Sequence, residues 1–110
     1  MPDIIELSEA TFDQEVLHCD LPVLIDMWAP WCEPCHTISR FVVEIAADYE
    51  GRIKVAKMNI DDNMAFTKHF KIESIPTLML FKNRKLVARK TGVMPKNGIE
   101  AMIKPHISET

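Results

Sequence analysis

The sequence predicts a single α/β domain over residues 1–110, with a central mixed sheet of about five strands flanked by about four helices. Segments typical of strands and helices alternate through the first half of the chain, which favours parallel strands joined by right-handed crossovers. Two strand-like segments then follow each other across a short turn, which adds an antiparallel hairpin, and a helix ends the pattern. No Pro- or Gly-rich linker divides the chain.

The first three elements form a strand–helix–strand unit. Ile4–Leu7 can form a short strand, and Ser8 is a plausible N-cap for a helix over Glu9–Leu17, whose apolar residues have helical spacing. Pro22 interrupts the pattern. The next segment, Val23–Ala29, is almost entirely apolar, as in a central strand that is covered on both faces.

The longest predicted helix starts at Pro34 and ends near Gly51, since glycine is common just beyond helix ends. Its apolar stripe consists of Ile38, Val42, Ile45, Ala46 and Tyr49. Ile53–Ile60 is consistent with another buried strand. Asp61 and Asp62 suit the start of a short helix that buries two aromatic side chains, namely Phe66 and Phe70.

The end of the chain predicts a hairpin and a last helix. The strands are Thr77–Phe81 and Leu86–Thr91, joined by a turn at Asn83–Arg84, and Gly92 ends the second strand. Pro95 can open the helix. This helix buries Ile99, Met102 and Ile103, and Pro105 should end it at about Lys104.

The charge and hydropathy patterns argue against two classes of function. The net charge is −3 and the basic residues are scattered, so no basic stripe favours nucleic acid. The longest apolar stretches are far shorter than the ~20 residues of a membrane helix. No basic segment followed by a long apolar run stands at the N-terminus, so we expect no secretory signal and a cytosolic protein.

Cys32 and Cys35 are the main candidates for chemistry. Two residues separate them at the start of the long helix, so both lie in its first turn, close enough to form a disulfide. The helix N-terminus carries a partial positive charge and free N–H groups, which stabilise a thiolate. We predict that Cys32, at the very end of the helix, attacks target disulfides and that Cys35 resolves the resulting mixed disulfide.

Two other interpretations of the cysteine pair remain. The pair could form half of a zinc site, but Cys19 and the four histidines provide no second ligand pair at the usual spacing. It could also be an inert pair in the core. The position of the pair beside a strand–helix–strand pattern favours redox chemistry, without metal or bound cofactor. We interpret Cys19 as an unpaired structural thiol, with regulation by glutathionylation or dimer formation as the alternative.

Asp26 is the one charged residue in the apolar run Val23–Ala29. A carboxylate in a buried strand is costly unless it has a partner or a task. Burial should raise its pKa, so that it could exchange protons near neutral pH. Lys57, in the next strand pattern, could lie near it. The sequence leaves open whether Asp26 transfers protons or is a structural acid paired with Lys57.

Several separated motifs resemble the thioredoxin family. They are the active-site segment Asp26–Cys35 (DMWAPWCEPC), the strand Val55–Asp61, the loop Ser74–Leu78 and Gly92. The likeness runs in order from about Ile4 to Ile103, so it is far more specific than a lone Cys-x-x-Cys motif.

The resemblance implies a thioredoxin fold and a protein-disulfide reductase that carries electrons and contributes to cell redox homeostasis. It implies that the Ile75–Pro76 bond is cis and that Pro76 lies against the two sulfurs. It implies that Asp26, helped by Lys57, assists deprotonation of Cys35. The implied substrate groove consists of Trp31, Ile75, Pro76, Thr91, Gly92 and Val93. From its place in the chain, we expect Trp28 to lie in the core.

The resemblance also implies partners. The electron donor would be an NADPH-dependent thioredoxin reductase. The typical clients of the family are ribonucleotide reductase, peroxiredoxins and methionine sulfoxide reductase. We expect a monomer that binds neither nucleic acid nor membrane. A thiol oxidase or disulfide isomerase on the same fold, and a binding module without redox turnover, are the alternative functions.

The sequence departs from the family pattern at several positions. Glu33, beside Pro34, replaces the usual glycine between the cysteines. Its charge should make the Cys32 thiolate less stable and favour a lower, more reducing potential, although a solvated carboxylate would have little effect. Ser74 and Thr91 make the groove edge more polar. Further departures are Arg40, Arg84 and Pro105, none of which removes catalytic chemistry.

Overall fold

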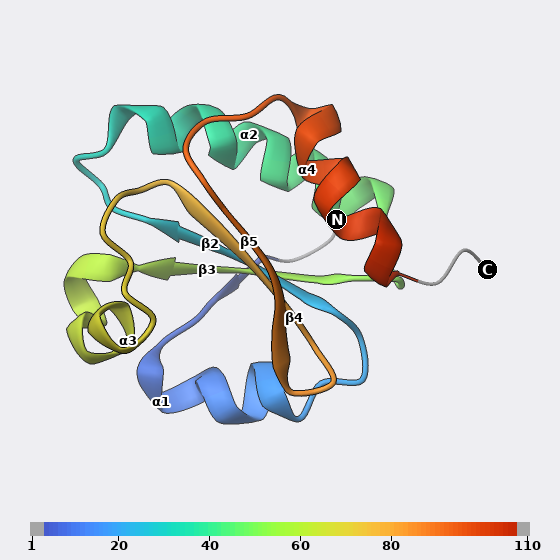
Figure 1. Cartoon of the computed structure of the whole chain (residues 1–110), viewed down its shortest axis with the longest axis horizontal. Helices are drawn as coiled ribbons and strands as arrows, with labels where there is room; N and C mark the ends of the chain where they lie inside the picture. Colours follow the sequence, from blue (N-terminus) through green and yellow to red (C-terminus); the bar gives the residue numbers. More distant parts are fainter. Residues whose placement is uncertain (1–3, 108–110) are drawn as a thin grey trace.

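The computed structural model describes residues 4–107, which form a five-stranded sheet with helices on both faces (Figure 1). The strands, in their order across the sheet, are β1 (Ile5–Glu6), β3 (Lys54–Asn59), β2 (Val23–Trp28), β4 (Thr77–Lys82) and β5 (Lys85–Thr91). β3 is parallel to β1 and β2, whereas β4 is antiparallel to β2 and β5. The predicted mixed sheet is therefore confirmed. The first three residues, on which the expectation about a secretory signal partly rests, lie outside the described part.

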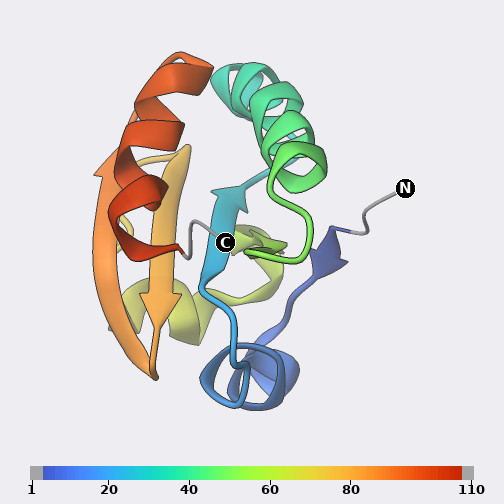
Figure 2. The ribbon, with the colours of Figure 1, turned by 90° about the vertical axis from the view of Figure 1, so that its right-hand side faces the viewer.

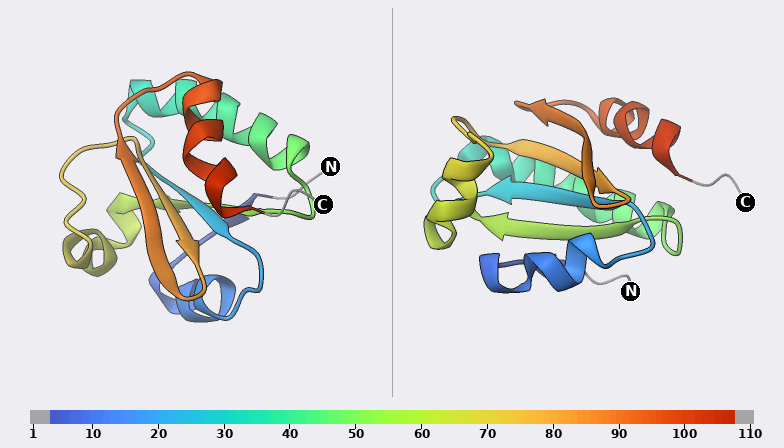
Figure 3. Two further views of the ribbon diagram at one scale, coloured as in Figure 1. Left: turned by 45° about the vertical axis from the view of Figure 1, so that its right-hand side comes forward. Right: turned by 60° about the horizontal axis from the view of Figure 1, so that its bottom comes forward.

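Helices cover both faces of this sheet (Figures 2 and 3). The long helix α2 (Glu33–Asp48) and α4 (Lys96–Ile103) lie on one face. α1 (Glu9–Phe12), its π-helical continuation η1 (Asp13–Leu17) and α3 (Met64–His69) lie on the other. Two 3₁₀ turns complete the described elements, η2 (Ile60–Asp62) and η3 (Lys104–His106).

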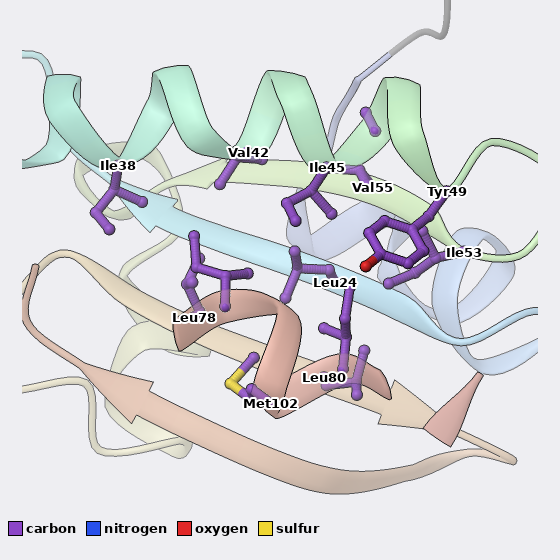
Figure 4. Close-up of a cluster of buried hydrophobic side chains, with 13 residues drawn as sticks. Leu24, Ile38, Val42, Ile45, Tyr49, Ile53, Val55, Leu78, Leu80 and Met102 are labelled. Carbon is purple, nitrogen blue, oxygen red and sulfur yellow. The ribbon is translucent and has the colours of Figure 1, made fainter. Parts of the chain in front are cut away.

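The alternation of side chains along β2 divides the core into two layers, since successive residues of a strand point to opposite faces. Leu24 packs in the layer under α2 and α4, whereas Ile25 and Met27 pack in the layer against α1 and α3. Figure 4 shows Ile38 and Val42 pointing from α2 toward the sheet in the first layer. Asp26 has the same parity as Leu24 and therefore projects toward the side of α2, the helix whose N-terminal end holds Cys32 and Cys35.

The structure corrects the first predicted helix and confirms the bounds of the last. The first helix is α-helical only as far as Phe12, and then continues with wider turns in which the His18 N–H donates to the Asp13 carbonyl. The last α-helix ends at Ile103, near the predicted position, but Pro105 does not stop the helical path. Proline lacks an N–H donor, yet it is tolerated in the first turn of a helix, here the 3₁₀ turn η3.

The structure also moves the start of the helix after β3. Asp61 and Asp62 lie in η2 instead of opening α3, which begins at Met64 after its N-cap Asn63. The side chain of Asn59 accepts a hydrogen bond from the Asp61 N–H at 2.9 Å, which holds the chain in a tight turn at the end of β3. This turn places Asp61 beside the active site.

The predicted helix end near Gly51 and the predicted turn at Asn83–Arg84 are both confirmed. Gly51, just beyond α2, has φ 86°, a left-handed conformation that costs glycine little because it has no Cβ. Asn83 and Arg84 both have positive φ between the paired ends of β4 and β5. This is the geometry of a two-residue type I′ hairpin turn, which asparagine tolerates well.

Candidate active site

Cys32 and Cys35 form a disulfide at the N-terminus of α2, with their Cα atoms 5.3 Å apart. Cys32 is the N-cap residue, and its Sγ accepts a hydrogen bond of 3.3 Å from the Cys35 N–H. Cys32 is 5% exposed and Cys35 1%, so the expected order of accessibility holds, although both side chains are largely covered. The N–H donor and the positive end of the helix would both stabilise negative charge on the Cys32 sulfur after reduction.

The loop before β4 lies against this disulfide. The Ile75–Pro76 peptide bond is cis, as the family resemblance implies. The Ile75 carbonyl oxygen is 3.9 Å from Cys32 Sγ. Because a disulfide sulfur carries no proton, this is a contact and not a hydrogen bond in the oxidised form. The Gly92 N–H donates to the Pro76 carbonyl at 2.8 Å. This hydrogen bond joins the loop after β5 to the cis-proline loop before β4, and both loops belong to the predicted groove.

A hollow of about 560 Å³ opens beside Cys32. Its lining residues are Trp31, Cys32, Glu33, Pro34, Ile60, Ile72, Glu73, Ser74 and Ile75. Trp31 is 65% exposed, and its Nε1 donates to the Asp61 carboxylate at 3.0 Å, which fixes the indole at the rim.

The predicted groove is only partly the same as this hollow. Trp31 and Ile75 line it together with Cys32, whereas the lining does not include the other predicted residues, which are Pro76, Thr91, Gly92 and Val93. Pro76 is buried, whereas Thr91 and Val93 are exposed. Thr91 is the last residue of β5 and pairs with Thr77 of β4, with the two hydroxyls 3.1 Å apart.

Sequence reasoning missed Ile60, Ile72 and Glu73 as groove residues. Glu73 immediately precedes the Ser74–Leu78 motif, so its position in the chain was a usable signal. Ile60 and Ile72 have the character of core residues, and only the path of η2 and of the loop after α3 brings them to the hollow.

Asp26 is buried at 1% exposure, and burial raises its pKa to about 7, against an opposing effect of Lys57. The predicted proximity is confirmed, since Asp26 and Lys57 are register partners in β2 and β3. A direct ion pair between them is not formed. The Lys57 Nζ lies 4.0 Å from Glu6 and 5.1 Å from the Trp28 ring centre. Asp26 Oδ1 has no hydrogen-bond partner among the described residues.

Other candidate residues lie as follows. Trp28, expected in the core, is only partly buried, although its Nε1 atom is covered and has no partner within residues 4–107. Cys19 is a free, partly buried thiol. Glu33 and Pro34 are exposed at the mouth of the hollow.

Within the described chain, no group of three or more His, Cys, Asp or Glu side chains could hold a metal ion, and no helix could cross a membrane.

Comparisons with known proteins agree with this geometry. The Thioredoxin family model matches residues 3–105. The chain is 41% identical over 107 residues to the thioredoxin of Haemophilus influenzae, which covers 97% of this chain and 100% of that protein. It is 47% identical over 103 residues to the thioredoxin of Porphyra purpurea, covering 94% and 96%. It is 45% identical over 102 residues to thioredoxin 1 of Nostoc sp., covering 93% and 95%.

The match spans the whole fold and includes the redox-type cysteine pair at the start of α2. The chain belongs to the thioredoxin family, and it is a thiol–disulfide oxidoreductase.

Proposed function

We propose that the chain reduces protein disulfides with Cys32 as nucleophile and Cys35 as resolving thiol. The observation that carries this assignment is the hydrogen bond from the Cys35 N–H to Cys32 Sγ at the N-terminus of α2. A charge-assisted donor of this kind stabilises the thiolate, which is the reactive form. Cys35 lies deeper, so it reacts with Cys32 and not with the client.

The reaction takes place in two exchange steps. The Cys32 thiolate attacks one sulfur of the client disulfide, so that a mixed disulfide forms and the other client sulfur leaves as a thiolate. The Cys35 thiolate then attacks Cys32 Sγ, which forms the internal disulfide and releases the second client sulfur. The client gains two electrons from the dithiol and two protons, and the protein ends in its Cys32–Cys35 disulfide form.

Asp26 is proposed to accept the proton of Cys35 in the second step, with Lys57 as a positioning residue. Two observations support this role: the pKa of Asp26 is raised to about 7 by burial, and the residue projects toward the side of α2. A carboxyl group with a pKa near the working pH can accept and release a proton in each cycle. Lys57 lies next to it in β3 and moderates the pKa.

The groove residues proposed for binding the client backbone are Trp31, Ile75, Pro76, Thr91, Gly92 and Val93. Family membership implies a reductase and disulfide-containing clients in general. We propose an NADPH-dependent thioredoxin reductase as donor and ribonucleotide reductase, peroxiredoxins and methionine sulfoxide reductase as clients. We further propose a monomeric, single-domain cytosolic protein.

Glu33 is proposed to make the reduction potential of the Cys32–Cys35 pair more negative, so that the pair is a stronger reductant. Pro34 and Trp28 are proposed to shape the surroundings of the pair. The carboxylate disfavours the neighbouring Cys32 thiolate and thereby favours the disulfide. Because Glu33 is exposed, solvent screens its charge. A Glu33→Gln variant is expected to have a reduction potential less negative by roughly 5–20 mV, the equivalent of one exposed charge interaction. An unchanged or more negative potential would contradict the tuning role.

A coupled turnover assay tests the proposed reductase. A thioredoxin reductase, NADPH and a disulfide-bonded protein are mixed, and NADPH oxidation is followed with and without the chain. We expect continuous oxidation that depends on the chain, that is lost in Cys32→Ser and that persists in the control Cys19→Ser. Reduction of the chain by the reductase without any onward reduction of the client would exclude a reductase role.

A further inference from the structure

The hollow beside Cys32 combines an apolar floor with an acidic rim. Ile60, Ile72 and Ile75 provide the apolar surface, and the indole of Trp31 stands at the edge, held by Asp61. Among residues 4–107, the charged side chains that line the hollow are Glu33 from the first turn of α2 and Glu73 from the loop before the cis proline. No described Lys, Arg or His lines it.

Both rim carboxylates are exposed and form no ion pair with another described residue. Neither forms a side-chain hydrogen bond with any other described residue. Some other surface acids are paired, as Glu15 is with Lys54 and Glu44 is with Lys96. The rim of the hollow therefore presents negative charge that a bound molecule could neutralise.

We propose that Glu33 and Glu73 determine client specificity, so that the protein prefers disulfides flanked by Lys or Arg. A client segment at Cys32 lies next to this hollow, since Cys32 itself and Ile75 line it. An apolar residue of the client fits the floor, and a basic residue beside the reacting cysteine faces the two carboxylates. Complementary charge of this kind raises the association rate and rejects acidic partners.

The preference is confined to the positions next to the client cysteine. Beyond Glu73 basic side chains join the surface, because the adjoining hollow is lined by Lys68 and Lys71 together with Met64, Ile72 and Glu73 itself. A basic residue farther along the client would meet these lysines and would gain nothing. This inference rests on the proposed reductase function and adds the class of its substrates.

The test uses three symmetric disulfide dimers of a short peptide with one cysteine, identical except for Lys, Gln or Glu at both positions flanking that cysteine. The full chain in its reduced form is mixed with each dimer, and the second-order rate constant of reduction is measured at low salt and at high salt. We expect the Lys peptide to react about three- to tenfold faster than the Gln peptide at low salt, the Glu peptide to react more slowly, and the differences to shrink in high salt.

Variants assign the effect to the rim. In Glu33→Gln/Glu73→Gln the ratio of the Lys to the Gln rate constant should fall close to one, and Glu73→Lys should favour the Glu peptide. The ratio cancels any change that Glu33→Gln makes to the intrinsic reactivity of Cys32. The matched control Glu9→Gln/Glu50→Gln changes the net charge as much as the double variant, but away from the hollow, and should keep the wild-type ratio.

Two results would overturn the specificity alone: equal rate constants for the three peptides with the wild type, or a preference for Lys that the double variant retains. Failure to reduce any of the three peptides would be a different result, because it would overturn the proposed reductase function on which the inference rests.

Discussion

Replacing Cys35 with serine is expected to stop the reaction after its first step and to leave the client covalently attached to Cys32. The variant keeps the Cys32 thiolate and the backbone N–H of residue 35 that donates to it, so the attack on the client disulfide proceeds. A serine hydroxyl does not displace a thiolate, so the mixed disulfide persists. Turnover should fall to the background rate, and mass spectrometry under non-reducing conditions should find one client per chain.

Two controls make this result specific to the pair. Cys32→Ser should lose turnover without forming any adduct, because it lacks the attacking sulfur. Cys19→Ser should behave like the wild type, and in combination with Cys35→Ser it should leave the adduct on Cys32 unchanged. Turnover of the Cys35→Ser variant at a rate near that of the wild type, or an adduct on Cys19 in place of Cys32, would contradict the assigned roles.

Replacing Asp26 with asparagine is expected to stabilise the oxidised protein strongly above neutral pH. The carboxyl group has a pKa of about 7 in the folded chain because of its burial, against an ordinary value of 3.8. Between these two pH values the folded state holds its proton and the unfolded state does not. Unfolding therefore releases a proton, and stability falls as the pH rises from about 4 and levels off above about pH 7.

The size of this effect follows from the pKa of Asp26, which is about three units higher in the folded than in the unfolded state. At 1.36 kcal/mol per unit, the wild type loses on the order of 4 kcal/mol of stability between pH 4 and pH 8, and asparagine cannot ionise. Urea unfolding of both proteins across this range should show a stability difference that grows in favour of Asp26→Asn. Any cost of burying the amide is independent of pH and does not affect the slope. A difference that stays constant from pH 4 to pH 8 would contradict the raised pKa.

The strands and the active-site turn could be predicted because their signals are local. The apolar run before the Cys-x-x-Cys motif and the stripe along α2 each specify one element, and the predicted bounds of both lie within three residues of the observed ones. The π-helical turns after Phe12 and the 3₁₀ turn at Ile60 have no such periodic signal. The latter is held by hydrogen bonds of the Asn59 and Asn63 side chains with the backbone.

The groove could be predicted only in part, since it is assembled from segments that are distant in the chain. Ile60 and Ile72 have apolar side chains like those of the core, and nothing in their neighbourhood distinguishes a groove from an interior. The register of β2 and β3 placed Lys57 beside Asp26, as expected, but register does not decide where a long flexible side chain ends. The Lys57 ammonium turns toward Glu6 and Trp28, so the buried carboxyl stays without an ion-pair partner.

The most direct test of the central claim is the reduction potential of the Cys32–Cys35 pair. The protein is equilibrated with defined ratios of reduced and oxidised thiol buffer, its free thiols are alkylated, and the two forms are counted by mass. A protein-disulfide reductase should have a reduction potential well below that of the cytosolic glutathione pool, which is about −220 to −260 mV when measured by biochemical extraction. A value between roughly −180 and −120 mV, the range of isomerases and oxidases, would show that the pair oxidises its clients and would contradict the account.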